Sequence, residues 1–358
     1  MHLKNLWLYQ FKNHQQQSFD FIDGINAIYG KNGVGKTNIL DSIYYLCNGK
    51  SYFTNTDSKV VSIGADELSV RGIFSFDNNA EDDVLIKFNS QKKKIIQKNQ
   101  KTYKRLIDHV GNFPVVMVTP TDIALIYDGS EERRRFMDLV LCQTNKNYML
   151  ALQQYKKILE ARNAVLKNMY DKNIKDFTLL EGYNIKILPN ALFIAEERKK
   201  FITIFAPIFS EIYQKIAQQK DNISFMYETN SPFFEQHINE QMEKDYYAGR
   251  TTKGVHKDDL LFLLDDEPIK KFASQGQIKS FLIALKIAQF DYIKIITNKK
   301  PILLLDDIFE KIDEDRAQAL INLVSELHFG QIFISDTHKS RLEKHIFGLN
   351  TSINIIPL

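Results

Sequence analysis

The sequence has little cysteine and no long apolar run, and each shortage argues against a class of protein. Only two cysteines occur, Cys47 and Cys142, and they lie far apart. That spacing suits neither a disulfide scaffold nor a metal site, and it is typical of a reducing compartment. No apolar run approaches the roughly 20 residues of a transmembrane helix. The opening MHLKNLWLYQFKNH lacks a basic segment followed by an apolar core, so we expect a cytoplasmic protein with no signal peptide and no membrane partner.

Strong net charge is also missing. The chain has 47 Lys and Arg against 44 Asp and Glu, a formal net charge of +3. Bulk charge therefore does not require nucleic-acid binding, and any basic surface has to be local. A hydrophobic content of 44% and a charged content of 25% are ordinary for a globular protein. The 358 residues suffice for two lobes with a sizeable core.

The start of the chain has an α/β pattern, and the middle is mainly helical. The first 30 residues alternate as strands do, GKTNILDSIYYLC has helical spacing, and residues 59–118 are rich in strand-like segments. Residues 131–220 carry apolar side chains three and four apart, with little glycine or proline. This spacing predicts a series of amphipathic helices.

The end of the chain returns to the α/β pattern. We expect a hairpin in GVHKDDLLFLLDDEPIKKFAS, a helix over 275–297 and a buried strand in PILLLDD, whose continuous apolar run is typical of a parallel sheet. A helix over 313–328 and the strand QIFIS follow. The simplest architecture is an α/β lobe of residues 1–118 and 250–358, with a mainly helical lobe of residues 119–249 inserted.

A phosphate-binding loop is predicted at GKNGVGKT, which matches the pattern G-x-x-x-x-G-K-[ST] in full. A predicted strand precedes it and a predicted helix follows. Lys36 is expected to reach the β- and γ-phosphates, and Thr37 to bind Mg²⁺. A glycine-rich turn with an incidental lysine is the alternative. The predicted ATP-binding residues are Gly30, Lys31, Asn32, Gly33, Val34, Gly35, Lys36, Thr37 and Asn38.

Two acids end the strand in PILLLDD. Asp306 is expected to hold Mg²⁺, as the acid at the end of the strand does in phosphate-loop enzymes. Asp307, the next residue, is the candidate for polarising the attacking water. Many strands end in acids, so this motif alone is weak, but it gains weight beside a complete phosphate loop.

Four small polar residues stand where a helix begins, in the segment FASQGQIKSF. A helix N-terminus presents free N–H groups and a partial positive charge, so it suits an anion. Ser274 offers a hydroxyl, and Gly276 permits a close approach of the backbone. An ordinary helix cap at Ser274 is the alternative. The predicted anion-binding residues are Ser274, Gln275, Gly276 and Gln277.

The three motifs follow each other along the chain as phosphate loop, polar helix start and acid-ended strand, and in this order they resemble the ABC-type ATPase superfamily. In that superfamily the motif at the helix start, called the signature, binds the γ-phosphate of a nucleotide held by a different ATPase unit. The resemblance therefore implies that Ser274 acts in trans, across a dimer. The long separation of Thr37 from Ser274 argues against a transporter ATPase, and the lack of a heptad coiled coil argues against a structural-maintenance-of-chromosomes protein.

Blocks along nearly the whole chain resemble the RecF family of bacterial recombination mediators. The His-Lys-Asp-Asp block and the arginine-rich block are more particular to that family than the phosphate loop is. The resemblance implies an ABC-type, SMC/Rad50-like ATPase head whose sheet is built from both chain ends. The blocks are YGKNGVGKTNILDSIYYLCNGKSY, TPTDIALIYDGSEERRRFMD, YKKILEARNAVLK, RTTKGVHKDDL, FASQGQIKSFLIALKIA and PILLLDDIFEKIDEDR.

The RecF resemblance also implies a function. It implies an ATP- and Mg²⁺-dependent homodimer that binds duplex DNA at gaps and junctions and hydrolyses ATP weakly when stimulated by DNA. Partners implied in the same way are RecR with RecO, and the recombinase RecA. The alternatives are a subunit of a transporter ATPase, and a nucleotide-gated scaffold without significant turnover.

Two further elements of the superfamily stay open in the sequence. A histidine that senses the γ-phosphate often follows the last strand, but here Asp336 has that position and His338 comes two residues later. An exposed loop histidine is an equal alternative. The glutamine loop has no clear counterpart, and Asp122 is the nearest polar candidate.

A local basic stretch, QKKKIIQKNQKTYKR, holds cations and no acid. As a hairpin it could contact DNA phosphates without reading bases. A solvated strand edge is the alternative, because lysine also discourages edge-to-edge aggregation. In a second cluster, Arg133 to Arg135, we expect at least one arginine to be structural. The candidate DNA contacts are Lys92, Lys93, Lys94, Lys98 and Lys101.

Overall fold

The computed structural model divides the chain into two compact units. The first comprises Met1–Ile123, Glu211–Gln219 and Gln275–Leu358, and the second comprises Ala124–Ser210 and Lys220–Ser274. The residues described are 1–91, 93–217, 221–229, 238, 240–310, 314–326, 329–346, 349 and 351–358.

The second boundary differs from the one that we predicted. We expected the inserted lobe to end at residue 249, but it extends to Ser274. The reason is the strand β10 (Asp259–Leu264), which pairs with β9 (Ile223–Glu228) and contacts α3 (Ser130–Thr144). The predicted hairpin is present as β10 and β11 (Glu267–Pro268), but it belongs to the helical unit.

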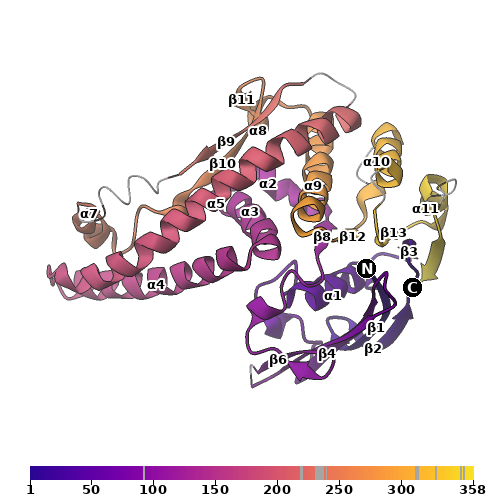
Figure 1. Cartoon of the computed structure of the whole chain (residues 1–358), viewed down its shortest axis with the longest axis horizontal. Coiled ribbons are helices and arrows are strands. Elements are labelled where there is room, and N and C mark those ends of the chain that lie inside the picture. Colours follow the sequence, from indigo (N-terminus) through magenta and orange to yellow (C-terminus); the bar gives the residue numbers. More distant parts are fainter. Residues whose placement is uncertain are drawn as a thin grey trace. The chain divides into compact units, whose positions relative to one another are not determined.

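The first unit holds two sheets, and the helix α1 (Lys36–Asn48) contacts strands of both (Figure 1). One sheet is antiparallel, in the order β2-β1-β4-β5-β6-β7, and the other is parallel, in the order β14-β3-β13-β12-β8. The antiparallel strands are β1 (His2–Phe11), β2 (His14–Asp20), β4 (Glu67–Ser75), β5 (Glu81–Asn89), β6 (Lys94–Lys98) and β7 (Lys101–Thr102). The parallel strands are β3 (Ile25–Tyr29), β8 (Val115–Val118), β12 (Ile302–Leu305), β13 (Ile332–Asp336) and β14 (Ile353–Pro357).

The parallel sheet confirms that both chain ends build one sheet. Strands β8 and β12 are buried at every position, as their continuous apolar runs predict. We did not predict β14, which adds to the free side of β3. The remaining elements of this unit are η1 (Asp57–Lys59), η2 (Leu106–Asp108), η3 (Pro120–Ile123), α9 (Gln275–Thr297), η5 (Ile308–Glu310), α10 (Glu314–Glu326) and α11 (Lys339–Ile346).

The second unit joins long helices to a small sheet, ordered β11-β10-β9. The aromatic rings of Phe201, Phe205 and Phe209 lie four residues apart along the helix α5, so they share one face. That face packs on Phe225 of β9, which in turn contacts Phe262 of β10. The helices are α2 (Ala124–Tyr127), α3, α4 (Lys146–Asp171), α5 (Thr178–Ala217), α7 (Gln241–Ala248), η4 (Val255–Lys257) and α8 (Ile269–Phe272).

No helix in the described part of the chain has both the length and the apolar character to cross a membrane. The long helix α5 contains Pro189 and Pro207 and is interrupted by charged residues.

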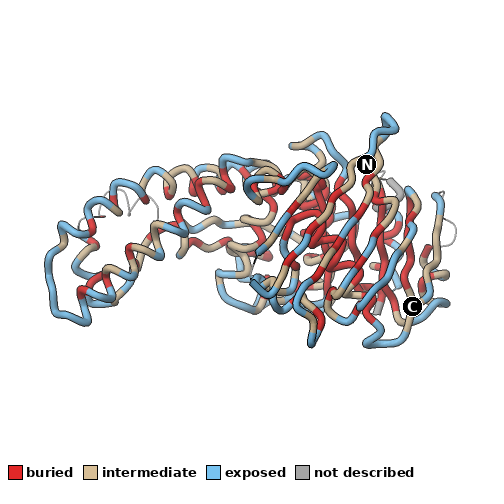
Figure 2. The backbone as a smooth tube through the Cα atoms, turned by 90° about the horizontal axis from the view of Figure 1, so that it is seen from below, coloured by how far each residue is buried: buried red, intermediate tan, exposed pale blue. Residues whose placement is uncertain are grey.

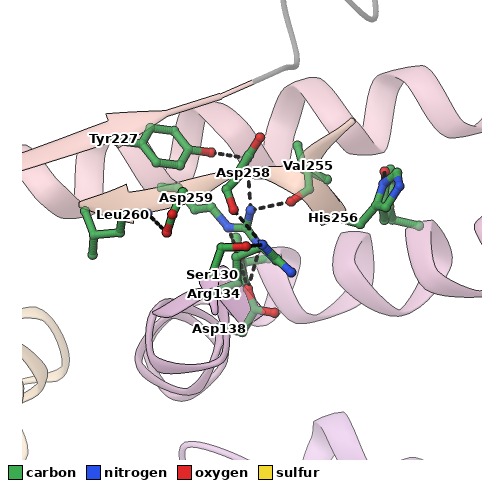
Figure 3. Close-up of polar contacts among 12 residues, drawn as sticks. Ser130, Arg134, Asp138, Tyr227, Val255, His256, Asp258, Asp259 and Leu260 are labelled. Carbon is green, nitrogen blue, oxygen red and sulfur yellow. Dashed lines mark hydrogen bonds and ion pairs between the residues drawn. The ribbon is translucent and has the colours of Figure 1, made fainter. Parts of the chain in front are cut away.

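A buried cluster of charges holds the second unit together where the GVHKDDL block meets α3 and α5 (Figure 3). The Arg198 guanidinium, 2% exposed, contacts Asp138 at 2.9 Å and Asp258 at 3.0 Å. It also donates to the carbonyl of Val255 at 2.9 Å. The hydroxyl of Tyr227 donates to Asp258. The block that resembles the RecF family is therefore part of the folding core of this unit.

We predict that Arg198→Met strongly destabilises the second unit. Removing the guanidinium leaves two carboxylates in a buried site without their cation, which typically costs ~3–5 kcal/mol. Urea unfolding followed by far-UV circular dichroism measures the loss, because this unit contributes most of the long helices. The control is Lys200→Met on the same helix, whose exposed pair with Glu197 should matter little. Equal unfolding midpoints for the two variants would contradict the prediction.

Candidate functional site

The predicted phosphate loop connects the end of β3 to the start of α1, as its motif requires. Gly35 precedes α1 and has a φ of 111°, a left-handed conformation that glycine adopts without strain. A Cβ atom at Gly35 would lie 2.5 Å from Nε2 of His14 and 2.7 Å from the amide of Asn13. Both the backbone conformation and the surroundings therefore exclude any larger residue.

The turn between β1 and β2 supports the loop from outside, which the sequence did not reveal. Nδ2 of Asn13 donates to the carbonyl of Val34 at 3.1 Å, and Nδ2 of Asn38 donates to Oδ1 of Asn13 at 2.7 Å. Nε2 of His14 donates to the carbonyl of Gly35 at 3.0 Å. These side chains hold carbonyl groups from behind and leave the loop's own N–H groups to a ligand.

Lys36 lies within the loop, with only 4% of its surface exposed. Its ammonium group donates to the carbonyls of Gly30 at 2.8 Å and Lys31 at 3.1 Å. A buried ammonium needs such acceptors, and a phosphate oxygen is a stronger one because it is charged. This position suits the predicted contact with the β- and γ-phosphates.

Thr37 and Asp306 meet, although 269 residues separate them along the chain. The Thr37 hydroxyl donates to the two carboxylate oxygens at 2.9 and 3.0 Å. Ser335, at the end of β13, donates to Asp306 at 2.7 Å and accepts the backbone N–H of Asp307 at 2.9 Å. Ser335 thus orients both predicted acids, and we did not identify it from the sequence. The sequence feature that could have identified Ser335 is its position directly before Asp336, at the end of the strand β13.

Burial raises the pKa of Asp306 above its ordinary value. The hydrogen bonds from Ser335 and Thr37 oppose that change in pKa, while the neighbouring Asp307 adds to it. The oxygens of Thr37 and Asp306 are the hard ligands that Mg²⁺ prefers. The residues therefore fit a divalent cation that would lower the pKa of this carboxyl.

Asp307 adopts an unusual backbone conformation, with a φ of 46°. A non-glycine residue in the left-handed region carries strain, which tends to persist at functional sites. It directly follows Asp306, so it lies at the same end of the sheet as the phosphate loop. Its position is compatible with the predicted role in catalysis.

The two candidates for a γ-phosphate sensor lie in different environments. The carboxylate of Asp336 is buried and pairs with the Arg341 guanidinium at 2.7 and 2.8 Å. That pairing favours a structural role for Asp336. His338 is exposed, with its ring nitrogen 2.8 Å from the Thr337 hydroxyl, so it has the freedom that a sensor needs.

Asp122, the candidate for the glutamine loop, is part of a buried charge cluster. It lies 3.0 Å from the Lys286 ammonium, and both side chains are almost fully buried. Lys286 also donates to the Tyr52 hydroxyl at 2.9 Å, and Tyr52 donates to Asp122. The cluster links α9 to the segment after α1 and to the end of β8, which favours a structural role for Asp122.

The predicted signature stands at the start of α9. Ser274 and Gln275 are exposed, as a contact with another molecule requires. Gly276 has a neighbour in its own chain, because a Cβ atom there would lie 2.7 Å from Nη2 of Arg316. Nε of Arg316 also donates to the hydroxyl of Ser280 at 2.7 Å. Because that atom is the far end of a flexible side chain, this neighbour alone does not require glycine at the position.

The candidate DNA contacts fall into two groups. Lys93 and Lys101 are exposed, whereas Lys92 lies outside the described residues. Lys98 pairs with Asp82 at 3.0 Å. The basic stretch is therefore a hairpin of which only part is available to a ligand.

Lys94 points inward rather than toward solvent. Its ammonium lies 2.7 Å from Asp57 and 4.5 Å from the centroid of the Tyr45 ring, and it donates to the carbonyl of Gly49. Burial lowers the pKa of this lysine. The geometry favours a structural role for Lys94 over the DNA contact that we expected.

Arginines of the second cluster are structural, as we expected of at least one. Arg133 forms a two-point pair with Asp259 at 2.7 and 2.9 Å. Arg134 donates to the Ser130 hydroxyl at 2.6 Å and to the carbonyl of Asp258 at 2.7 Å (Figure 3). These contacts tie α3 to the start of β10.

Comparison with known proteins gives a consistent set of relatives. A family model described as an AAA domain matches residues 2–344. The chain is 41% identical to the DNA replication and repair protein RecF of Flavobacterium johnsoniae, with 100% of both chains covered. It is 40% identical to the protein of that name from Cytophaga hutchinsonii, covering 95% of this chain and 90% of the relative.

Solved structures agree with the sequence relatives. The chain is similar to the recombination mediator protein RecF-ATP in the RecFOR pathway, with a TM-score of 0.87, 26% identity, and coverage of 94% and 92% of the two chains. A head domain of Smc, bound to the C-winged helix domain of ScpA, has a TM-score of 0.55 at 17% identity and covers 96% and 92%. The latter likeness shows the fold alone, that of an ABC-type ATPase head.

We predict that Asp306→Asn stabilises the metal-free protein at neutral pH. A carboxyl whose folded pKa exceeds its ordinary 3.8 takes up a proton more readily when folded, so its ionisation costs stability above the folded pKa. The neutral amide removes that cost and should raise the unfolding midpoint by roughly 2–4 °C. The gain should shrink as the pH falls toward 3.8.

The measurement follows the fluorescence of the single tryptophan, Trp7, which lies in the same unit, during heating in EDTA. The control is Asp66→Asn at an exposed carboxylate of that unit. A lower midpoint for Asp306→Asn than for the unmodified chain at neutral pH would disprove the argument.

Proposed function

The chain belongs to the RecF family of DNA replication and repair proteins, and from that membership we propose that it is an ATP-dependent recombination mediator. It binds ATP, dimerises around it and holds duplex DNA at gaps and junctions. The contact between Thr37 and Asp306 carries this proposal, because it joins the phosphate loop to the acid-ended strand. The relatives named above support the biological setting.

In this function the loop and its neighbours have separate tasks. The N–H groups of the loop and the ammonium of Lys36 bind the β- and γ-phosphates. Thr37 and Asp306 would hold Mg²⁺, which neutralises charge on the phosphates. Asp307 accepts a hydrogen bond from the attacking water and orients it, and Ser335 keeps the backbone of Asp307 in position.

The signature acts on a second copy of the chain. Ser274 donates its hydroxyl to the γ-phosphate of ATP bound by the partner, and the N-terminus of α9 adds its dipole. ATP thus connects the two copies, and its slow hydrolysis, stimulated by DNA, releases them. ATP and DNA strengthen each other's binding, since both favour the closed dimer. The exposure of Ser274 and Gln275 supports this role.

The dimer marks gaps so that a recombinase is loaded there. The similar RecF-ATP structure belongs to the RecFOR pathway, which supports RecR, with RecO, as the partners of this step. RecA as the recombinase follows from the resemblance to the RecF family. The reaction belongs in the cytoplasm, where the DNA is. Exposed lysines of the β6–β7 hairpin contact phosphates, which gives affinity for DNA without base reading.

We predict that two substitutions separate nucleotide binding from dimerisation. Lys36→Ala should abolish ATP binding, because the loop loses its one buried cation contact with phosphate. Ser274→Ala should bind ATP with unchanged affinity but remain monomeric. Titration with a fluorescent ATP analogue measures binding, and light scattering with and without ATP measures mass. A Ser274→Ala protein that dimerises normally with ATP would contradict the action in trans.

A second prediction concerns DNA. Reversing the charge of Lys93 and Lys101 together should weaken duplex binding uniformly across sequences. It should also lower the slope of log affinity against log salt by about 2, roughly one per phosphate contact. Fluorescence anisotropy of a labelled duplex with ATP measures both. The matched control reverses Lys59 and Lys300, two exposed lysines of the same unit. An equal slope for both double variants would exclude the hairpin from the DNA site.

A further inference from the structure

A fully buried serine stands among apolar side chains of the helix α9. Buried positions, red in Figure 2, run through the first unit, and most of their side chains are apolar. Ser280 lies among them at 0% exposure, on the helix that begins with the signature. A buried hydroxyl is unfavourable unless it has a hydrogen-bond partner, so the chain has to supply one.

The partner of Ser280 is Arg316, in the first turn of α10. Nε of Arg316 donates to the Ser280 hydroxyl at 2.7 Å. The end of the same guanidinium lies over Gly276, where a Cβ atom would be 2.7 Å from Nη2. Gly276 and Ser280 are four residues apart, so they share one face of α9. One flat side chain therefore covers the first turn of the signature helix and is fixed by a hydroxyl one turn further along.

The charge of Arg316 is unfavourable for both helices. Cations are disfavoured near a helix N-terminus, because the unpaired N–H groups there already carry positive charge. The Arg316 guanidinium nevertheless belongs to the first turn of α10 and lies over the first turn of α9. Packing alone gives no reason for a charge here, since a neutral amide could also donate to Ser280. An anion that arrives at the signature would offset the repulsion.

The position of Arg316 along the chain adds a second connection. The helix α10 begins shortly after Asp307, the candidate acid of the molecule's own ATP site. Ser274, by contrast, is proposed to act on the ATP of a partner. Arg316 thus ties the segment that follows one ATP site to the motif that serves the other site.

We propose that Arg316 is a positioning residue of the signature. It holds the first turn of α9 at Gly276, so that the Ser274 hydroxyl and the N–H groups of the helix point at the γ-phosphate carried by a second copy of the chain. Its charge adds to the attraction for that phosphate. This inference rests on the proposed action of the signature in trans and goes beyond it, because it names a residue outside the motif on which that action depends.

Single variants test the position first. Arg316→Met and Ser280→Ala should bind a fluorescent ATP analogue as tightly as the unmodified chain, because each chain binds its own ATP with the phosphate loop. Arg316→Met should weaken ATP-dependent dimerisation about tenfold, since a hydrogen bond of a charged group is lost, and Ser280→Ala should weaken it less. Arg316→Lys keeps the charge but not the flat fork, so it should rescue only part of the loss. Light scattering over a range of protein concentrations at saturating ATP measures the dimer constant.

A double variant shows whether Ser280 and Arg316 act as a unit. Ser280→Ala with Arg316→Met should have the dimer constant of Arg316→Met alone, because Ser280 acts only through the guanidinium. The matched control is Arg71→Met, at an exposed arginine of the same unit that pairs with Asp83, and it should dimerise normally. Additive losses in the double variant would contradict a shared role.

Mixing experiments separate action in trans from a loss of folding. Arg316→Met keeps an intact phosphate loop and Lys36→Ala keeps an intact signature, so a mixed dimer contains one complete ATP site. At a concentration where neither variant dimerises alone, we expect the mixture to dimerise and to hydrolyse ATP. Arg316→Met mixed with Ser274→Ala should stay inactive, because every interface then has an impaired signature.

Three results would overturn the proposal. The first is normal dimerisation of Arg316→Met with ATP, under conditions where Ser274→Ala stays monomeric. The second is a lower unfolding midpoint together with lost ATP affinity in both Arg316→Met and Arg316→Lys, which would make the arginine merely structural. The third is a Lys36→Ala protein that rescues Ser274→Ala but not Arg316→Met. If Lys36→Ala rescues neither, the proposed action in trans fails, and this inference fails with it.

Discussion

The hydrogen bond between Thr37 and Asp306 is the contact on which the first unit's chemistry depends. It joins a residue in the first turn of α1 to the acid that follows β12, 269 residues later in the chain. Three groups converge there, because Ser335 reaches the same carboxylate from a second strand, β13. Their oxygens are brought together by the order of strands in the parallel sheet. Any change that separates β12 from β13 would therefore also separate these groups.

Much of this arrangement could be predicted from the sequence. The phosphate loop and PILLLDD each have a pattern that physical chemistry requires, namely glycines before a helix and an apolar run that ends in acids. The first and last residues of α9 also agree with the prediction. The helix starts at small polar residues, and apolar side chains at helical spacing continue to its end. Such features are local, and the sequence records them directly.

Other features could not be predicted, because they arise from pairing over long distances. The support of the loop by Asn13 and His14, the cover of Gly276 by Arg316 and the inward turn of Lys94 depend on which elements become neighbours. The end of the inserted lobe was missed for the same reason. The sequence of the β10–β11 hairpin predicts two paired strands, but it does not indicate which unit those strands belong to.

The position of β3 has a consequence for synthesis of the protein. Both of its neighbours, β13 and β14, come from the last 30 residues or so of the chain. A nascent chain therefore exposes an apolar strand next to its phosphate loop until residues 332–357 have been synthesised. During that interval the N-terminal segment depends on chaperones or on its own antiparallel sheet for protection against aggregation.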